Sequence, residues 1–82
     1  MNCNLDGLLE LLELCDEEEM TVYRLSRRFN RATAIRYVKF LLSKGFLEVR
    51  GTRKRGDFEV KVYGTTEKGR RLLKLFEGDG LA

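Results

Sequence analysis

Arginine and lysine are the residues of this chain best suited to bind another molecule. There are 16 of them among 82 residues, and all lie between Arg24 and Lys74. Three are contiguous, at Arg53, Lys54 and Arg55. Cations this close repel one another, and a nearby phosphate backbone would relieve that repulsion. Because arginine also offers forked donors that suit phosphates and base edges, these residue types point to a polyanionic ligand.

The charge of the chain is divided along its length. The formal net charge is +3, yet residues 1–20 contain seven acidic side chains and no lysine or arginine. That segment carries −7, so the remainder carries +10. A basic region on a small domain favours nucleic acid, and above all double-stranded DNA. Charges that only keep the surface solvated would explain their abundance but not their separation.

Residues suited to catalysis or metal binding are few. The chain has no histidine, and its two cysteines, Cys3 and Cys15, do not form a Cys-x-x-Cys pair. A zinc site needs nitrogen or sulfur ligands that are lacking here, and neither cysteine has a base nearby in the sequence to make it a nucleophile. We therefore expect that the chain is not an enzyme and that it binds no metal or cofactor. Cys15 is expected in the core, although a disulfide within or between chains stays open.

Three helices are predicted in the first half of the chain, each after a typical N-cap residue. They are helices 5–15 after Asn4, 22–28 after Thr21 and 31–44 after Asn30. Gly45 is expected to end the third with a left-handed cap. The first carries a wide apolar stripe made of Leu5, Leu8, Leu9, Leu12 and Cys15, extended by Leu11. The stripe is wider than the face that packs against a single core, so part of it could bury against a second subunit.

A β-hairpin and a further helix are predicted in the second half. Phe46 to Arg50 forms one strand, and alternating apolar residues from Phe58 to Tyr63 form the other. Between them, residues 51–57 form a basic loop bounded by glycines. Thr66 can cap a last helix over 67–76. The expected fold is one α+β domain over 1–82, with a three-helix core, a two-stranded hairpin and a C-terminal helix.

Two helices joined by a tight turn form a helix-turn-helix, whose second helix can enter the major groove of DNA. In the third helix, the small residues Ala32 and Thr33 permit close approach, while Arg31 and Arg36 supply donors. Tyr37 is expected on the same outward face as a base or methyl contact, with packing as its alternative. The basic loop at the hairpin end would reach the flanking backbone or the minor groove.

Two segments at this point resemble winged helix-turn-helix transcription regulators. ATAIRYVKFLLSKGFLEV, residues 32–49, is similar to their recognition helix and first wing strand, and VYGTTEKGRRLL, residues 62–73, to their second strand and last helix. The resemblance covers roughly residues 5–76 and is strongest to small archaeal regulators and chromatin-associated proteins. It implies that Thr33, Arg36 and Tyr37 face the groove and that residues 53–55 form the wing tip. It also implies that the junction residues Tyr63, Thr66, Lys68 and Gly69 are structural.

The leading hypothesis is a double-stranded DNA-binding transcription regulator, acting as a homodimer through helix 5–15, helix 67–76 or both. A close alternative is a less selective architectural DNA-binding protein, which differs in the balance of base and phosphate contacts. A winged-helix protein-interaction adaptor would leave the basic hairpin unexplained. RNA ranks lower, because the major groove of its duplex is deep and narrow. No membrane segment or secretion signal is recognised, so we expect a cytoplasmic, nucleoid-associated protein.

Overall fold

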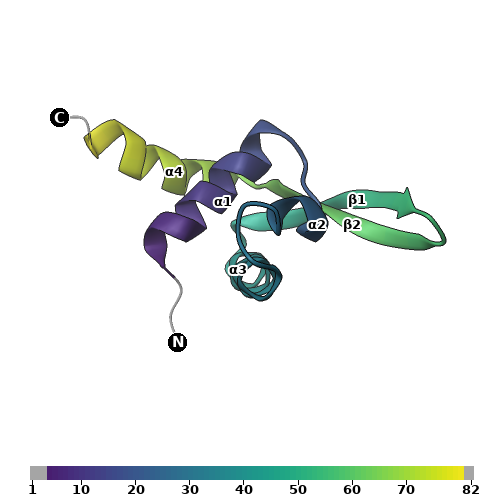
Figure 1. Cartoon of the computed structure of the whole chain (residues 1–82). Coiled ribbons are helices and arrows are strands. Elements are labelled where there is room, and N and C mark those ends of the chain that lie inside the picture. Colours follow the sequence, from purple (N-terminus) through teal and green to yellow (C-terminus); the bar gives the residue numbers. More distant parts are fainter. Residues whose placement is uncertain (1–3, 81–82) are drawn as a thin grey trace.

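The computed structural model describes residues 4–80, with side chains up to Phe76, as helices around the base of one β-hairpin (Figure 1). The elements are α1 (Leu5–Glu17), α2 (Val22–Leu25), α3 (Arg31–Ser43), β1 (Leu47–Arg55), β2 (Phe58–Thr65) and α4 (Glu67–Gly80). The hairpin projects to one side and α4 runs to the other, so the molecule measures 49 × 27 × 20 Å. None of the helices in the described part of the chain has the length and apolar character needed to cross a membrane.

The three N-caps predicted for the first half are confirmed. The side chain of Asn4 accepts a hydrogen bond from the N–H of Asp6 at 2.9 Å, and that of Asn30 accepts one from Thr33 at 2.8 Å. Thr21 accepts from Arg24 at 3.1 Å. The helix that Thr21 begins is shorter than the predicted 22–28, because only residues 22–25 are α-helical and turns follow them.

The end of α3 is a left-handed cap, as predicted at Gly45, whose φ is +81°. The N–H of Gly45 donates to the carbonyl of Leu42 at 3.1 Å, and the N–H of Phe46 donates to that of Leu41 at 3.0 Å. These two bonds define a Schellman motif, which satisfies the last carbonyls of a helix and turns the chain sharply. The turn leads directly into β1, so it sets the orientation of the hairpin relative to α3.

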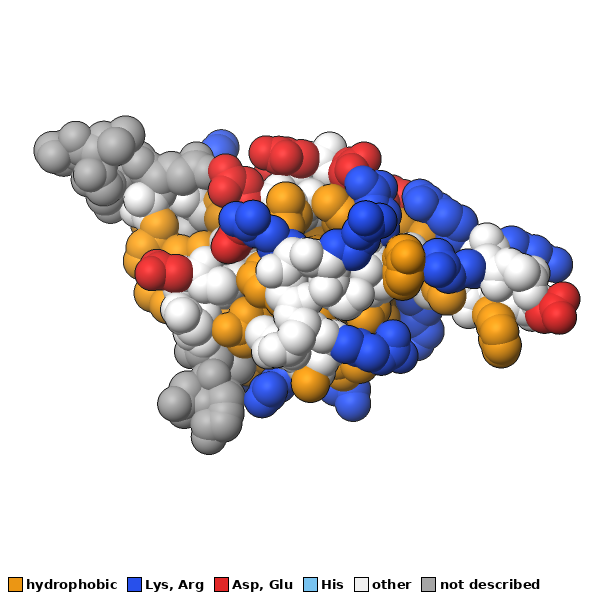
Figure 2. All heavy atoms as spheres, viewed as in Figure 1, with side chains coloured by type: hydrophobic (Ala, Val, Ile, Leu, Met, Phe, Trp, Pro, Cys, Tyr) orange, Lys and Arg blue, Asp and Glu red, His pale blue; other side chains and the backbone are white. Residues whose placement is uncertain are grey.

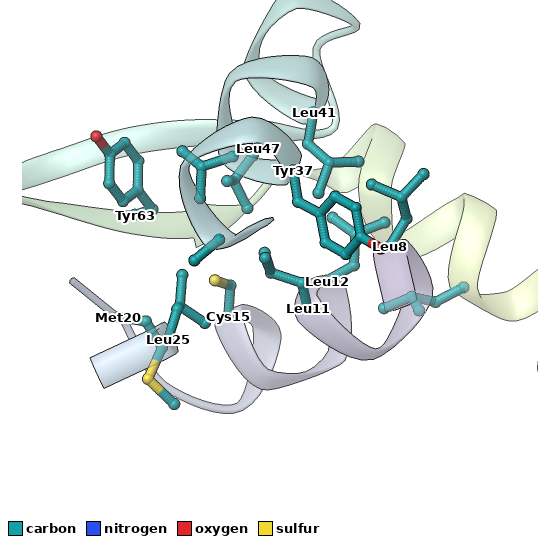
Figure 3. Packing of buried hydrophobic residues seen from close by; sticks show 13 residues of the cluster. Leu8, Leu11, Leu12, Cys15, Met20, Leu25, Tyr37, Leu41, Leu47 and Tyr63 are labelled. Atoms are coloured by element: carbon teal, nitrogen blue, oxygen red, sulfur yellow. The ribbon is translucent and has the colours of Figure 1, made fainter. Parts of the chain in front are cut away.

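The hydrophobic core lies between α1, α3 and the base of the hairpin (Figure 3). Leu11, Leu12, Leu25 and Leu41 are almost fully buried. The predicted stripe on α1 is confirmed at Leu8, Leu11, Leu12 and Cys15, which are buried. Leu5 is 50% exposed and lies outside the core.

Cys15 is buried in this core, as expected, at 3% exposure. Burial raises the pKa of its thiol to about 12, because the thiolate would lose its hydration. Cys3 lies outside the described residues, so the question of a disulfide stays open.

The hairpin is longer than predicted, and the expected basic loop over 51–57 is wrong. β1 continues to Arg55, which pairs with Phe58, and only Gly56 and Asp57 connect the strands. Gly56 has a φ of +65° and Asp57 does not have a positive φ, a pattern typical of type II′ hairpin turns. A β-bulge at Arg50 interrupts the alternation of β1 between Val49 and Gly51. This irregularity hid the outer half of the strand from the sequence pattern.

The junction between β2 and α4 holds the end of α3, as the resemblance implied. The hydroxyl of Thr66 donates to the carbonyl of Gly45 at 2.7 Å, and Nζ of Lys68 donates to that of Lys44 at 2.9 Å. A Cβ on Gly69 would overlap the carbonyl oxygen of Phe46 and lie 2.6 Å from Cγ2 of Thr65. Residues 65–69 (TTEKG) therefore hold the end of α3, the start of β1 and the start of α4 in contact. The α4 helix extends beyond the predicted 67–76, to Gly80.

Candidate nucleic-acid interface

The outward face of α3 carries two of the predicted DNA-binding side chains. Arg31 and Arg36 are exposed, and Thr33 is half-buried beside the Asn30 cap. Lys39 is exposed, lies three residues after Arg36 and so shares its helix face, although it was not among the predicted contacts. The three-residue spacing between Arg36 and Lys39 was the sequence signal that could have predicted Lys39 as a contact.

Tyr37 does not lie on this face, and its predicted groove contact is wrong for this structure. Its side chain is 7% exposed and packs edge-on against Phe29, with 5.7 Å between the ring centroids. The ring fits against α1 at Gly7, where an added Cβ would lie 2.9 Å from the Tyr37 ring. The Tyr37 hydroxyl accepts a hydrogen bond of 3.4 Å from the N–H of Asn4. Tyr37 therefore joins α3 to α1 and belongs to the core.

The three contiguous cations lie on the outer half of the hairpin, although on paired β1 rather than in a loop. Arg53 and Arg55 share one face of the hairpin, and Lys54 between them points to the other face. The guanidinium of Arg55 lies over the ring of Tyr23 on α2, 3.7 Å from the ring centroid. Tyr23 is 44% exposed and was missed at the sequence level, because no local pattern links it to residue 55.

A basic cleft separates α2 from the hairpin around this stacked pair. Besides Tyr23 and Arg55, the residues lining it are Thr21, Arg24, Arg27, Arg53, Lys54 and Val60. A neighbouring hollow adds Arg31 and Lys61, so the basic surface continues from the hairpin to the start of α3. Figure 2 shows basic side chains over the hairpin, α2 and the surroundings of α3.

Some basic residues have carboxylate partners, and those of α3 and the outer hairpin have none among the described residues. Acidic residues of α1, the turn after it, β1 and α4 pair with Arg24, Arg28, Arg50, Arg70 and Arg71. Within residues 4–76, by contrast, no ion pair involves a cation of α3 or of the hairpin beyond Gly51. Those cations are Arg31, Arg36, Lys39, Arg53, Lys54, Arg55 and Lys61. Four of the six carboxylate partners lie between Glu10 and Glu19, and none of the six reaches the cations of α3 or of the outer hairpin.

The arrangement of helices and hairpin is that of a winged helix, with α2 and α3 as the helix-turn-helix and β1–β2 as the wing. A solved structure has the same fold. PadR of Bacillus subtilis, crystallised in complex with operator DNA, matches with a TM-score of 0.76 at 21% identity. The match covers 89% of this chain and 46% of the PadR chain, so this chain corresponds to about half of that protein.

No protein-family model and no curated protein matches the chain. The likeness to the PadR structure confirms the predicted winged-helix fold. At this low sequence identity, the likeness shows the fold and nothing further. The resemblance to archaeal and chromatin-associated proteins stays a prediction, as does contact of Arg31, Thr33, Arg36 and residues 53–55 with DNA.

Proposed function

We propose that this chain binds double-stranded DNA as a transcription regulator. In this proposal α3 enters the major groove, and the wing contacts the flanking backbone or the minor groove. A major groove admits an α-helix, and the exposed Arg36 and Lys39 on one face of α3 suit base edges and phosphates. The structural likeness to PadR, which was crystallised with operator DNA, supports DNA binding by this fold.

The observation that carries the proposal is the group of cations on α3 and the outer wing that have no ion-pair partner among the described residues. Surface arginines that already have a carboxylate partner, such as Arg70 with Asp16 at 3.3 Å, gain less from a phosphate. The cations of α3 and the outer wing have no such partner among the described residues, so phosphates can take that place. Binding would release counterions from DNA and would weaken as the salt concentration rises.

The direct test is a fluorescence anisotropy titration of a labelled random duplex at several salt concentrations, with wild type and Arg36→Ala. We expect wild-type affinity to fall steeply with salt. The same two proteins are then titrated against a site selected from random sequences, where loss of a base contact by Arg36 should weaken binding by about 1–3 kcal/mol. Folded protein that does not bind duplex even at low salt would contradict the proposal and favour the adaptor alternative.

A second titration separates a specific regulator from an architectural protein. A site selected from random sequences would bind a regulator at least ~10³-fold more tightly than random duplex. A ratio near one would instead support the architectural alternative.

We further propose that the protein acts as a homodimer on the nucleoid in the cytoplasm. Leu5 on α1 and Leu75 and Phe76 on α4 are 50%, 62% and 46% exposed. The start of α1 and the outer part of α4 lie at the end of the molecule opposite the hairpin (Figure 1), so pairing there would leave the wing free. Light scattering should give twice the monomer mass for wild type and the monomer mass for Phe76→Glu. A monomeric wild type at micromolar concentration would contradict the dimer.

A further inference from the structure

The most exposed large hydrophobic side chain among the described residues is Phe58, at 73% exposure. It is the first residue of β2, directly after the two-residue turn. Phenylalanine has no polar group to hydrate, and a ring that projects from a basic hairpin is free to contact a partner of that hairpin. Leu75, the next most exposed at 62%, belongs to α4 at the other end of the molecule.

The backbone around Phe58 is held in place although its ring is exposed. Phe58 is the cross-strand partner of Arg55, so the two side chains share one face of the hairpin. Arg55 is itself stacked on Tyr23 of α2 at 3.7 Å. The tip of the hairpin, which carries the ring, is therefore connected to the helix-turn-helix by the stacked contact between Arg55 and Tyr23.

The charges around the ring favour a polyanionic partner. Three cations, Arg53, Lys54 and Arg55, precede the turn, and two carboxylates, Asp57 and Glu59, flank Phe58. The cations outnumber the carboxylates, and none of the three has an ion-pair partner within the described residues. Phe58 also shares its face of the hairpin with its cross-strand partner Arg55. An apolar side chain beside a cation at the end of a narrow hairpin is a combination that suits entry into a minor groove and separation of a base step.

We propose that Phe58 is an apolar wedge, which inserts from the minor groove between neighbouring base pairs and bends the duplex. This inference rests on the proposed DNA binding and adds DNA bending to it. Insertion unstacks one base step and kinks DNA by about 20–90° toward the major groove. With α3 in the adjacent major groove, such a kink would bring more of the backbone to the basic cleft beside the wing.

DNA bending is measured by energy transfer between dyes at the two ends of a duplex, with wild type, Phe58→Ala and the control Val49→Ala. Val49 is also an exposed apolar residue of the hairpin, 45% exposed, but it lies at the base, opposite Tyr63. We expect wild type and V49A to raise the transfer efficiency, and F58A to bind without raising it. The affinity of F58A should fall by about 5- to 50-fold, in the range for loss of an aromatic side chain stacked on a base.

A second measurement places the ring itself. The chain contains no tryptophan, so Phe58→Trp and Val49→Trp each introduce a single reporter. Stacking on bases should quench the emission of F58W and protect it from acrylamide when duplex is added, and should leave V49W unchanged. Equal responses of the two reporters, or equal bending by wild type and F58A, would overturn the wedge. Wild type that does not bind duplex at all would overturn the proposed function as well, whereas binding without bending would overturn the wedge alone.

Discussion

The guanidinium of Arg55 lies over the ring of Tyr23, 3.7 Å from its centroid. The contact joins the outer half of the wing to α2. Every residue from Gly51 to Glu59 is exposed, so this part of the wing is not held by the core. A two-stranded hairpin alone is marginally stable in water. The stacked pair is therefore expected to hold the wing at one angle to α3 and to reduce the entropy lost when both contact DNA together.

We predict that Tyr23→Ala weakens DNA binding about two- to fivefold, the equivalent of an exposed cation–π contact of about 0.5–1 kcal/mol. Tyr23→Phe keeps the ring and should bind as wild type does. Anisotropy titrations of the three proteins at one salt concentration check this. A Y23F variant as weak as Y23A would show that the hydroxyl, rather than the stacked ring, matters.

Tyr37 provides a test of the core assignment. Tyr37→Phe loses only the long hydrogen bond from Asn4, so unfolding should become easier by less than about 1 kcal/mol and DNA affinity should not change. Tyr37→Ala empties a core site and should cost about 3–5 kcal/mol. Urea unfolding and DNA titration measure the two effects. If Y37F kept its stability but lost affinity for DNA, the hydroxyl would be a DNA contact after all.

Local signals in the sequence were enough for the helix ends, because a cap is built by its own neighbours. Asn30 accepts from Thr33 three residues later, and the left-handed Gly45 follows the helix that it ends. The direction of Tyr37 could not be obtained in this way. It depends on Gly7, which is 30 positions away and leaves space on α1 for the ring.

The wing shows the same limit of local information. Arg53, Lys54 and Arg55 resemble a solvated loop in composition, and the bulge at Arg50 breaks the alternation that would have marked them as a strand. Their pairing is supplied by β2, and the position of Arg55 by Tyr23. The sequence therefore placed Arg53, Lys54 and Arg55 on the hairpin, but it did not predict how they are held.

Gly69 should not tolerate a side chain. Gly69→Ala would push its Cβ against the carbonyl of Phe46 at the α3–β1 turn, and we expect a loss of about 1–3 kcal/mol in the free energy of unfolding. Arg71→Ala, an exposed change on the same helix, should stay within about 0.5 kcal/mol of wild type. Urea unfolding of both variants checks this. A G69A protein as stable as R71A would mean that α4 does not approach α3 this closely.

The buried thiol of Cys15 predicts a loss of stability at alkaline pH. The pKa of Cys15 is raised from 9.0 to about 12 in the folded protein, so between these values the unfolded chain binds fewer protons than the folded one. Stability must then fall as pH rises above 9.0, by at most about 1.4 kcal/mol per pH unit.

Urea unfolding between pH 8 and pH 10.5 measures this, with Cys15→Ala as the comparison. Both proteins carry Cys3→Ser, so that Cys15 is the one thiol that differs. Lysines and tyrosines contribute to both curves, and the difference isolates Cys15. Parallel curves would contradict the burial of a protonated thiol.

DNA is expected to bind the face formed by α3 and the wing, and not the other basic surfaces of the protein. The most direct test compares two double variants of equal charge, Arg53→Ala/Arg55→Ala on the wing and Arg71→Ala/Lys74→Ala on α4, in salt-dependent duplex titrations. We predict that the wing variant loses affinity and that its salt slope becomes shallower by up to about two units, while the α4 variant binds as wild type does. Equal losses in the two variants, or a larger loss in the α4 variant, would contradict the account.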